Sequence, residues 1–496
     1  MQEPWTLEAL LAACPGALIR RGGPVPVRGI AYDSRDVREG YCFVCIRGFR
    51  DDGHRYIADA QRRGAVAVVV EKAGPVPDAL ALAEVPDARH ALALIASRFY
   101  RHPSERLTLI GITGTEGKTT TAYLVEAVLR EAGTRVAMSG TIVSRIGEKE
   151  TPSHYTTPES LDLQRFLAEC VAEGASHAVM EVSSHALALK RVAACDFDLG
   201  VFTNLTSDHL DLHGRLETYL AAKASLFSSL GASPEHRAIV NADDPASERI
   251  LAATACPATT FGVQRAADLR ARDLTAALGQ LRLTMESPHA TFPVTLRLTG
   301  WVNAYSALAA AGVGLALGID PATIKRGLEG VSGIPGRFEL VDAGQPFLVV
   351  IDFAHTTAAL EKLLRTTRHL VSGRLLTVFG CSGDRDRTKR AAMGEVAARL
   401  SAYTILTSDN PAGEDPAGIA RQIQEGVRRV DPGGNYHAII LDRAEAIAAA
   451  CARARPGDAV LLAGKGHEPY QILAHGRVPW SEREAALAAL RLPGRG

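Results

Sequence analysis

The segment that decides the fold runs from an apolar stretch into a glycine-rich turn and reads Leu107-Thr108-Leu109-Ile110-Gly111-Ile112-Thr113-Gly114-Thr115-Glu116-Gly117-Lys118-Thr119-Thr120. Its first half predicts a buried strand, and a helical pattern over residues 119–132 follows the turn. A strand, a Gly-rich turn and a helix in this order are typical of a phosphate-binding loop. Backbone N–H groups of such a loop surround phosphate oxygens, and the helix N-terminus adds partial positive charge.

The loop is shorter than the usual eight-residue pattern, because Ile112 stands where a first glycine is expected. Lys118 would bridge the β- and γ-phosphates, and the Thr119 hydroxyl would bind Mg²⁺. A simple strand–helix turn is the alternative, but the Lys-Thr-Thr sequence favours nucleotide binding. We therefore predict an ATP site formed by Gly114, Thr115, Glu116, Gly117, Lys118, Thr119 and Thr120.

The composition excludes several classes of protein. The chain has 496 residues, with 55 lysines and arginines against 55 aspartates and glutamates, and 47% of its residues are apolar. This length suits two to four domains with cores of their own. Zero net charge argues against general binding to nucleic acid or to an anionic membrane. No apolar window reaches the ~20 residues of a membrane span, and we identify no signal peptide.

Eight cysteines are scattered along the chain, which is not the pattern of a disulfide framework. Cys42 and Cys45 have the spacing of a redox or zinc pair, but no second pair accompanies them. A structural role is therefore favoured over a redox or metal site. We expect a cytoplasmic protein and a monomer.

Strand-like runs alternate with helix-like stretches, which predicts an α/β fold with parallel sheets. Three domains are expected, over residues 1–105, 106–335 and 336–496. The second boundary falls at Gly333-Ile334-Pro335-Gly336, where proline and glycine favour a hinge. The predicted strands include residues 41–46, 65–70, 107–113, 347–351, 375–379, 403–407 and 459–463, and the predicted helices include 119–132 and 304–317.

Two further polar stretches follow apolar runs, and they begin at Glu181 and at Thr203. Open α/β sheets bind ligands at the carboxyl ends of their strands, so both stretches are candidates to lie beside the phosphate loop. The hard carboxylate of Glu181 suits Mg²⁺. The cluster Asp208-His209-Leu210-Asp211-Leu212-His213 also has the residue types of a zinc site. Mg²⁺ is favoured because the loop already implies a triphosphate.

Further motifs continue in order through all three segments: Asp33-Ser34-Arg35, Asp52-Gly53-His54, Thr156-Thr157-Pro158, Gly336-Arg337-Phe338-Glu339, Asp352-Phe353-Ala354-His355-Thr356, Gly383-Asp384-Arg385-Asp386, Asp409-Asn410-Pro411 and Gly464-Lys465-Gly466-His467-Glu468. Together they resemble the ATP-dependent Mur ligases of peptidoglycan assembly, and most closely the branch that adds the third amino acid to UDP-N-acetylmuramoyl-L-alanyl-D-glutamate. The resemblance implies an N-terminal uridine-nucleotide domain, a central P-loop ATPase-like parallel sheet and a C-terminal, Rossmann-like open sheet that binds the amino acid.

The resemblance also implies roles for individual residues. The UDP end would be held by Ser34, Phe49, Arg50 and Asp51. The muramoyl dipeptide would contact Thr156, Thr157, Ser183 and Arg191. Two Mg²⁺ ions would be bound by Thr119, Glu181 and His209 together with a modified Lys223. ATP would contact Asn303 and Arg337, with Asp352 at the ribose.

Lys223 aligns with the lysine that the family carbamylates. A carbamate formed from CO₂ converts an amine into an anionic Mg²⁺ ligand, which an arginine cannot supply. An exposed helix lysine is the alternative. It is disfavoured because only nine of the 55 basic residues are lysines.

The implied reaction has two steps. The D-glutamyl γ-carboxylate attacks the γ-phosphate of ATP, and the incoming amine then displaces phosphate from the acyl phosphate. Lys118 and the metal would screen the charge of the two anionic reactants. His355 or Asp386 would be candidates to assist the amine, but no residue is identified as the base.

The added amino acid is predicted from the residue after Asp409-Asn410-Pro411. Members that add meso-diaminopimelate typically carry an arginine there, which grips the distal carboxylate, whereas this chain has Ala412. The amino acid's own carboxylate and amine would be held by Arg385, Asn410, Gly464 and Glu468, and the distal pocket would be made acidic by Asp409, Glu414 and Asp415. We therefore predict L-lysine or L-ornithine rather than meso-diaminopimelate.

Two other functions stay open at this point. One is a Mur-like amide ligase that acts on a different acid outside cell-wall synthesis. The other is a regulatory ATP-binding protein without catalysis, which the retention of Lys118, Glu181, His209 and Lys223 disfavours.

Overall fold

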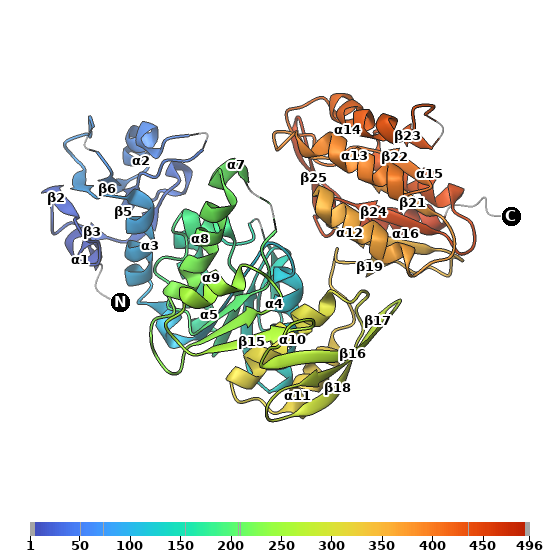
Figure 1. The fold of residues 1–496 in the computed structure, drawn as a ribbon. Helices are drawn as coiled ribbons and strands as arrows, with labels where there is room; N and C mark the ends of the chain where they lie inside the picture. Colours follow the sequence, from blue (N-terminus) through green and yellow to red (C-terminus); the bar gives the residue numbers. More distant parts are fainter. Residues whose placement is uncertain are drawn as a thin grey trace. The chain divides into compact units, whose positions relative to one another are not determined.

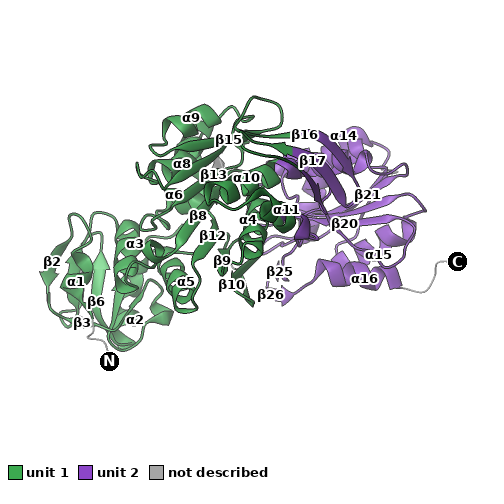
Figure 2. Ribbon diagram, turned by 90° about the horizontal axis from the view of Figure 1, so that it is seen from below, with its two compact units in different colours: residues 1–271, 285–292, 305–327 green, residues 272–284, 293–304, 328–496 purple. Residues whose placement is uncertain are grey.

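The computed structural model describes residues 5–49, 51–72, 74–153, 155–206, 208, 210–434 and 436–491 (Figure 1). The chain is divided into two compact units (Figure 2). Unit 1 comprises Met1–Ala271, Met285–Phe292 and Tyr305–Gly327, and unit 2 comprises Arg272–Thr284, Pro293–Ala304 and Leu328–Gly496. The domain boundaries predicted near residues 105 and 335 stay a prediction. In the part of the chain that the structure describes, no helix combines the length and apolarity needed to cross a bilayer.

The first sheet of unit 1 has five strands in the order β2-β7-β6-β5-β4. Strands β4 to β7 are parallel, and β2 is antiparallel to β7. Their bounds are β2 (Leu18–Arg21), β4 (Gly29–Ala31), β5 (Tyr41–Val44), β6 (Ala65–Val70) and β7 (Ala81–Glu84). The helices are α1 (Leu7–Leu11), α2 (Ile57–Arg62) and α3 (Ala88–Phe99), and a short ladder joins β1 (Trp5–Thr6) to β3 (Pro26–Val27). Separate apolar clusters form around this sheet, as expected for parallel strands covered on both faces.

The strand that precedes the phosphate loop, β8 (Thr108–Thr113), lies inside the second sheet, which has the order β11-β10-β9-β12-β8-β13-β14-β15-β16-β17-β18. It pairs in parallel with β12 (His177–Glu181) and β13 (Leu199–Phe202). The other strands are β9 (Val136–Ser139), β10 (Val143–Ile146), β11 (Lys149–Pro152), β14 (Arg237–Asn241), β15 (Ala258–Gly262), β16 (Leu269–Ala277), β17 (Gln280–Glu286) and β18 (Thr291–Leu296). The carboxyl ends of β8, β12 and β13 therefore meet at one edge.

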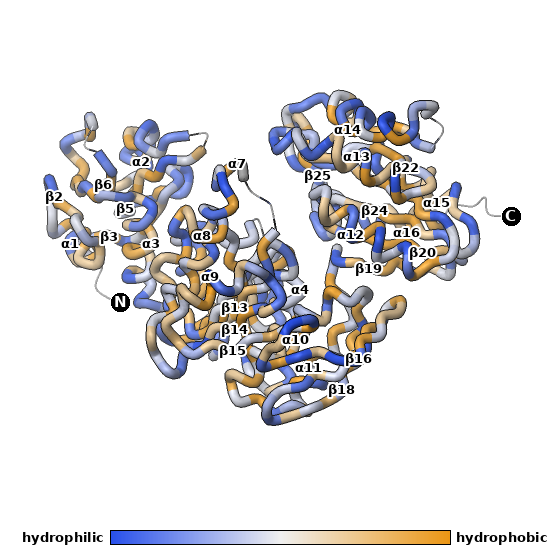
Figure 3. The backbone as a smooth tube through the Cα atoms, in the orientation of Figure 1, coloured by the Kyte–Doolittle hydropathy of each residue, from blue (hydrophilic) through white to orange (hydrophobic). Residues whose placement is uncertain are grey.

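The helices of this region are α4 (Lys118–Glu131), α5 (Ser160–Ala172), α6 (Ser184–Ala188), α7 (Leu210–His213), α8 (Leu216–Ser228), α9 (Ser247–Ala252), α10 (Asn303–Ala316) and α11 (Pro321–Gly330). Apolar residues concentrate on the strands, whereas polar residues gather on loops and outer helix turns (Figure 3). The last five of the six residues of β8 are buried. Burial of apolar side chains on both faces explains why this strand reads as a continuous apolar run in the sequence.

The main sheet of unit 2 has the order β19-β20-β24-β21-β22-β23. Strand β19 (Glu339–Leu340) is antiparallel to β20 (Leu348–Asp352), and the others are parallel: β21 (Leu375–Phe379), β22 (Tyr403–Leu406), β23 (His437–Ile439) and β24 (Ala459–Ala463). The helices are α12 (Thr357–Arg368), α13 (Lys389–Leu400), α14 (Pro416–Val430), α15 (Arg443–Arg453) and α16 (Glu482–Arg491), and a hairpin joins β25 (Tyr470–Leu473) to β26 (Gly476–Pro479). Because β24 inserts between β20 and β21, the chain turns to opposite sides there, which is where open α/β sheets bind ligands.

The α/β prediction with parallel sheets is confirmed. Strands β6, β21 and β24 have the predicted bounds, and β8 begins one residue later than predicted. Helices α4 and α10 each begin one residue earlier. Such small shifts at element ends are expected, since hydrophobic patterning locates a buried run better than it locates the terminal hydrogen bond.

A buried ion pair ties the start of α13 to the loop before α14. The two terminal guanidinium nitrogens of Arg390, whose side chain is wholly buried, each lie 3.0 Å from an oxygen of the Glu414 carboxylate. This contact is the main cause that lowers the pKa of Glu414 from 4.5 to about 2. The charged pair is thus present in the fold at all but strongly acidic pH.

Replacing Arg390 with Met is expected to lower the free energy of unfolding by about 3 kcal/mol at pH 7, because the Glu414 carboxylate loses its buried partner. The pair's contribution is complete above pH 4.5 and is lost as the pH falls toward 2, since the unfolded chain binds the proton first. Urea unfolding of both proteins at a series of pH values measures this. A difference that stays constant from pH 6 to pH 3 would contradict the assignment.

Candidate active site

The lysine of the phosphate loop donates hydrogen bonds to carbonyl groups of the loop itself. Lys118 is the first residue of α4, and its Nζ donates to the carbonyl oxygens of Gly114 at 2.9 Å and Thr115 at 2.8 Å. Gly114 and Gly117 have φ values of +151° and +84°, which side chains rarely adopt. The loop therefore has the conformation that its glycines predict, with a cation at the centre and a helix N-terminus behind it.

The end of β13 holds this loop in place. Thr203 Oγ1 donates to the Glu116 carbonyl at 2.6 Å, and Asn204 Nδ2 donates to the same oxygen at 3.1 Å. Asn204 Oδ1 accepts from the Glu116 N–H at 2.9 Å. A Cβ atom at Gly114 would lie 1.9 Å from Thr203 Oγ1, so this approach requires glycine. Sequence analysis expected the stretch that begins at Thr203 to lie beside the phosphate loop, but it gave Thr203 and Asn204 no individual role.

Glu181 lies at the end of β12 and is 1% exposed. Its carboxylate accepts from the Thr119 hydroxyl at 2.9 Å, and from the hydroxyl and the N–H of Thr141 at 3.0 and 2.7 Å. One carboxylate and one hydroxyl beside a phosphate loop fit Mg²⁺, which takes few protein ligands and completes its shell with water and phosphate. Among the described residues, no three His, Cys, Asp or Glu side chains are grouped to hold a metal ion. His209 lies outside the described residues.

Lys223 reaches the same loop from α8. Its side chain is 1% exposed, its Nζ donates to the Gly114 carbonyl at 2.8 Å, and the Tyr219 ring centroid lies 4.3 Å from it. Burial first, and then the nearby charge of Lys118, lower the pKa of Lys223 well below its ordinary value of 10.5. This shift favours the neutral, nucleophilic amine. The structure thus brings Lys118, Lys223, Thr119 and Glu181 to one place.

The residues carried over for the muramoyl dipeptide gather beside Glu181. Thr157 Oγ1 donates to the Glu181 carbonyl at 2.8 Å, and Thr156 Oγ1 accepts from Thr141 at 3.1 Å. Ser183 caps α6 and lies 3.3 Å from the Thr157 hydroxyl. Arg191 Nη1 donates to the Thr157 carbonyl at 3.1 Å. These four residues form a polar wall next to the phosphate loop.

The residues carried over for UDP are less closely tied. Ser34 is buried at the start of a short 3₁₀ helix and hydrogen-bonds Asp59, whereas Asp51 hydrogen-bonds Tyr56. Phe49 is 74% exposed. Arg50 lies outside the described residues. An exposed aromatic side chain on a loop is suited to stacking on a base, and the UDP assignment stays a prediction.

In unit 2, Arg337, Asp352 and His355 lie together at the end of β20. Asp352 accepts from the Phe338 N–H at 2.7 Å, and burial raises its pKa while the charge of Arg337 opposes the rise. Arg337 packs over the Phe353 ring, 5.0 Å from its centroid, and His355 Nδ1 lies 2.9 Å from the Phe353 carbonyl. Asn303 donates to the Thr299 carbonyl at 2.7 Å at the start of α10.

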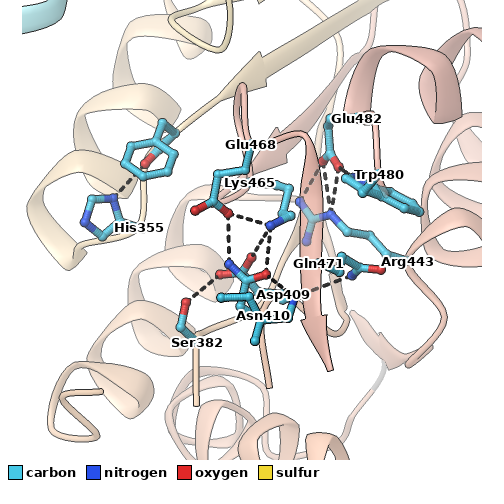
Figure 4. Close-up of polar contacts among 12 residues, drawn as sticks. His355, Ser382, Asp409, Asn410, Arg443, Lys465, Glu468, Gln471, Trp480 and Glu482 are labelled. Atoms are coloured by element: carbon cyan, nitrogen blue, oxygen red, sulfur yellow. Dashed lines mark hydrogen bonds and ion pairs between the residues drawn. The ribbon is translucent and has the colours of Figure 1, made fainter. Parts of the chain in front are cut away.

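A second polar cluster of unit 2 lies after β22 and β24 (Figure 4). Lys465, which is fully buried, donates to Asn410 Oδ1 at 2.9 Å and to Glu468 Oε2 at 2.5 Å. Gly464 has a φ of +98°, and its N–H donates to the Asp352 carbonyl, which joins this cluster to the end of β20. Sequence analysis included Lys465 in a motif but assigned it no function. Its signal was the scarcity of lysines in an arginine-rich chain.

The loop that carries Arg385 packs directly against the loop that carries Pro411 and Ala412. The Gly383 N–H donates to the Asn410 carbonyl at 2.8 Å, and Ala412 has a φ of +52° with its N–H bonded to the Ile472 carbonyl. Arg385 is exposed, and no ion pair joins it to another described residue. Arg385, itself predicted to bind the amino acid, is therefore an exposed cation on a loop that contacts Asn410.

Comparison with known proteins agrees with this arrangement. The chain matches the Mur ligase family, catalytic domain over residues 26–100, the Mur ligase middle domain over 112–314 and the Mur ligase, glutamate ligase domain over 336–466. It is 44% identical over 489 residues to a UDP-N-acetylmuramoyl-L-alanyl-D-glutamate--2,6-diaminopimelate ligase of Geobacillus thermodenitrificans, with 98% of this chain and 99% of the relative covered. The chain belongs to the Mur ligase family.

Two further relatives of this Mur ligase carry the same name. A 2,6-diaminopimelate ligase of Geobacter metallireducens is 45% identical, with 94% of each chain covered. A solved structure of such a ligase, 32% identical, covers 98% of this chain and 99% of its own with a TM-score of 0.68. The protein is therefore an ATP-dependent, ADP-forming ligase of peptidoglycan synthesis that joins an acid to an amino acid.

The prediction of L-lysine or L-ornithine as the added amino acid is wrong, since relatives at 42–45% identity over nearly the full chain are named as 2,6-diaminopimelate ligases. The structure gives the physical reason. Two of the three acids that were expected to make the pocket acidic are paired with arginines, and the third, Asp409, shares Lys465 with Glu468. Glu414 pairs with Arg390, Asp415 caps α14 and pairs with Arg421, and Asp409 accepts from Ser382 and lies 3.9 Å from Lys465.

Proposed function

We propose that this Mur ligase adds 2,6-diaminopimelate to the D-glutamyl γ-carboxylate of UDP-N-acetylmuramoyl-L-alanyl-D-glutamate through an acyl phosphate. The observation that carries the proposal is the match to the Geobacillus thermodenitrificans 2,6-diaminopimelate ligase along 98% of this chain. The exposed Arg385, on the loop whose Gly383 N–H donates to the Asn410 carbonyl, is consistent with it, because a cation there suits a carboxylate of the incoming amino acid. Cytoplasmic location is part of the proposal.

The residues of unit 1 would bind and orient the two anionic reactants. Lys118 and the loop N–H groups would hold the phosphates of ATP, and Thr119 and Glu181 would hold Mg²⁺, whose charge offsets that of the phosphates. A carbamate on Lys223 would supply a further anionic ligand. Thr156, Thr157, Ser183 and Arg191 would place the acceptor carboxylate beside the loop, so that attack on the γ-phosphate proceeds with little loss of freedom.

The deciding experiment incubates the protein with ATP, Mg²⁺ and the UDP-muramoyl dipeptide against 2,6-diaminopimelate, L-lysine and L-ornithine, each added separately. We expect a tripeptide product of the mass given by 2,6-diaminopimelate and the highest kcat/KM with that amino acid. Faster product formation with L-lysine or L-ornithine would reject the proposed substrate. Phosphate release without any amino-acid product would reject the ligase reaction.

Replacing Arg385 with Met is expected to raise the KM for 2,6-diaminopimelate by about tenfold to a hundredfold, because a charge-assisted hydrogen bond to a carboxylate is lost. The KM for ATP should stay within about twofold. Arg399→Met is the matched control, since Arg399 is exposed on α13 and pairs with Glu395 of the same helix. An equal KM for the amino acid in Arg385→Met and Arg399→Met would remove Arg385 from the site.

A further inference from the structure

The ammonium of Lys465 occupies a fully buried position between two loops of unit 2. Gly464 and Gly466 flank it with φ values of +98° and +54°, and a Cβ atom at Gly466 would lie 2.8 Å from the Cβ of Phe353. The loop after β24 is therefore held close to the end of β20. The Lys465 side chain points toward Asn410, Asp409 and Glu468, so its charge acts on these groups (Figure 4).

Lys465 fixes the orientation of the Asn410 amide. Asn410 Oδ1 accepts from Lys465 Nζ and from the Ile472 N–H, both at 2.9 Å, while Asn410 Nδ2 donates to Glu468 Oε2 at 2.9 Å. If the amide were rotated by half a turn, its NH₂ group would face two donors, which is unfavourable. In this orientation the second N–H of Asn410 and Oε1 of Glu468 have no partner among the described residues and can bind a ligand.

Lys465 is also the countercharge of this cluster. Its Nζ lies 2.5 Å from Glu468 Oε2 and 3.9 Å from Asp409 Oδ1, and that Asp409 oxygen is buried without a hydrogen-bond partner among the described residues. The neighbouring Arg443 forms its own ion pair with Glu482, with Nη2 of the arginine 2.6 Å from Oε1 of the glutamate. Two carboxylates thus share one ammonium, and the remaining negative charge suits a cationic group of a ligand.

We propose that Lys465 is a positioning residue that presets Asn410 and Glu468 to bind a zwitterionic amino acid. The open N–H of Asn410 would donate to the α-carboxylate, and the open oxygen of Glu468 would accept from the ammonium. The inference rests on the proposed function, in which Asn410 and Glu468 hold the incoming amino acid. It adds a determinant that touches neither substrate.

The test varies each substrate separately in Lys465→Met, which keeps an unbranched side chain, one atom shorter, and removes its charge and donors. The KM for the amino acid should rise by at least about tenfold, since two charge-assisted contacts no longer orient the binding groups. The KM values for ATP and for the UDP-muramoyl dipeptide should stay within about twofold. Lys465→Gln keeps an N–H donor for Asn410 and should recover part of the loss.

Arg374→Met is the matched control, because it breaks the 2.6 Å ion pair between Arg374 and the buried Asp458 in the same unit. It should lower the melting temperature and leave all three KM values unchanged. An unaltered amino-acid KM in Lys465→Met, or an equal rise for all three substrates, would overturn the inference. So would failure of both Lys465 variants to fold at the assay temperature, since the residue would then be structural.

The two proposals fail in different ways. If the unaltered protein adds another amino acid in place of 2,6-diaminopimelate, the proposed substrate is rejected, and the KM for the accepted amino acid still tests Lys465. If it adds 2,6-diaminopimelate and Lys465→Met shows the unaltered KM, the proposed function stands and the positioning role is rejected.

Discussion

Lys118→Met is expected to lower kcat by about a hundredfold to a thousandfold, the range found when one preorganised donor to a developing charge is removed. The reason is electrostatic. The D-glutamyl carboxylate and the γ-phosphate repel each other, and Lys118 is the cation at the centre of the phosphate loop, 2.9 Å from the Gly114 carbonyl. Initial rates of phosphate release at saturating substrates measure the loss.

Lys149→Met is the matched control for this prediction. Lys149 is exposed on β11, and its replacement removes one lysine charge from the same unit. Its kcat should equal that of the unaltered protein. Circular dichroism and the melting temperature establish that Lys118→Met is folded. A folded Lys118→Met protein with kcat within about threefold of the unaltered enzyme would exclude Lys118 from the reaction.

Lys223→Arg is expected to reduce kcat at least about a hundredfold, since misplacing a group that orients the reactants can cost that much. Arginine keeps the positive charge but offers no neutral amine to CO₂. Burial, and then the nearby charge of Lys118, lower the pKa of Lys223 well below 10.5, which favours the neutral, nucleophilic amine. The space is also limited, because the side chain is 1% exposed and lies against Tyr219.

The modification itself can be observed apart from activity. Carbon NMR of the protein in isotope-labelled bicarbonate should show one carbamate signal that is absent from Lys223→Arg. Removal of CO₂ from the buffer should lower the rate, and added bicarbonate should restore it. Absence of the signal together with a rate that is independent of CO₂ would leave Lys223 as an unmodified buried amine.

Strands of the parallel sheets could be predicted from the sequence because burial on both faces leaves a continuous apolar run. Strand β24, with all five residues buried, has the predicted bounds for this reason. The phosphate loop could also be predicted from the sequence, because its glycines, lysine and threonines lie close together along the chain. In both cases the information is local, so no knowledge of distant contacts is required.

The net charge of the amino-acid pocket could not be predicted from the sequence in the same way. A carboxylate contributes negative charge only when no cation neutralises it, and the partners of Glu414 are Arg390 and Arg387, which lie on another segment of the chain. The roles of Asn204 and Lys465 were missed for the same reason. Their contacts with Glu116 and Asn410 join segments separated by 88 and 55 residues.

The close fit between Gly114 and Thr203 restricts how this sequence can diverge. Because any side chain at position 114 would collide with the Thr203 hydroxyl, replacing Gly114 would require a smaller residue at position 203. The same hydroxyl holds the Glu116 carbonyl, so shortening residue 203 to make space would loosen the loop. We therefore expect substitutions at these two positions, which are 89 residues apart, to have interdependent effects, because the residues that follow β13 fix the shape of the loop.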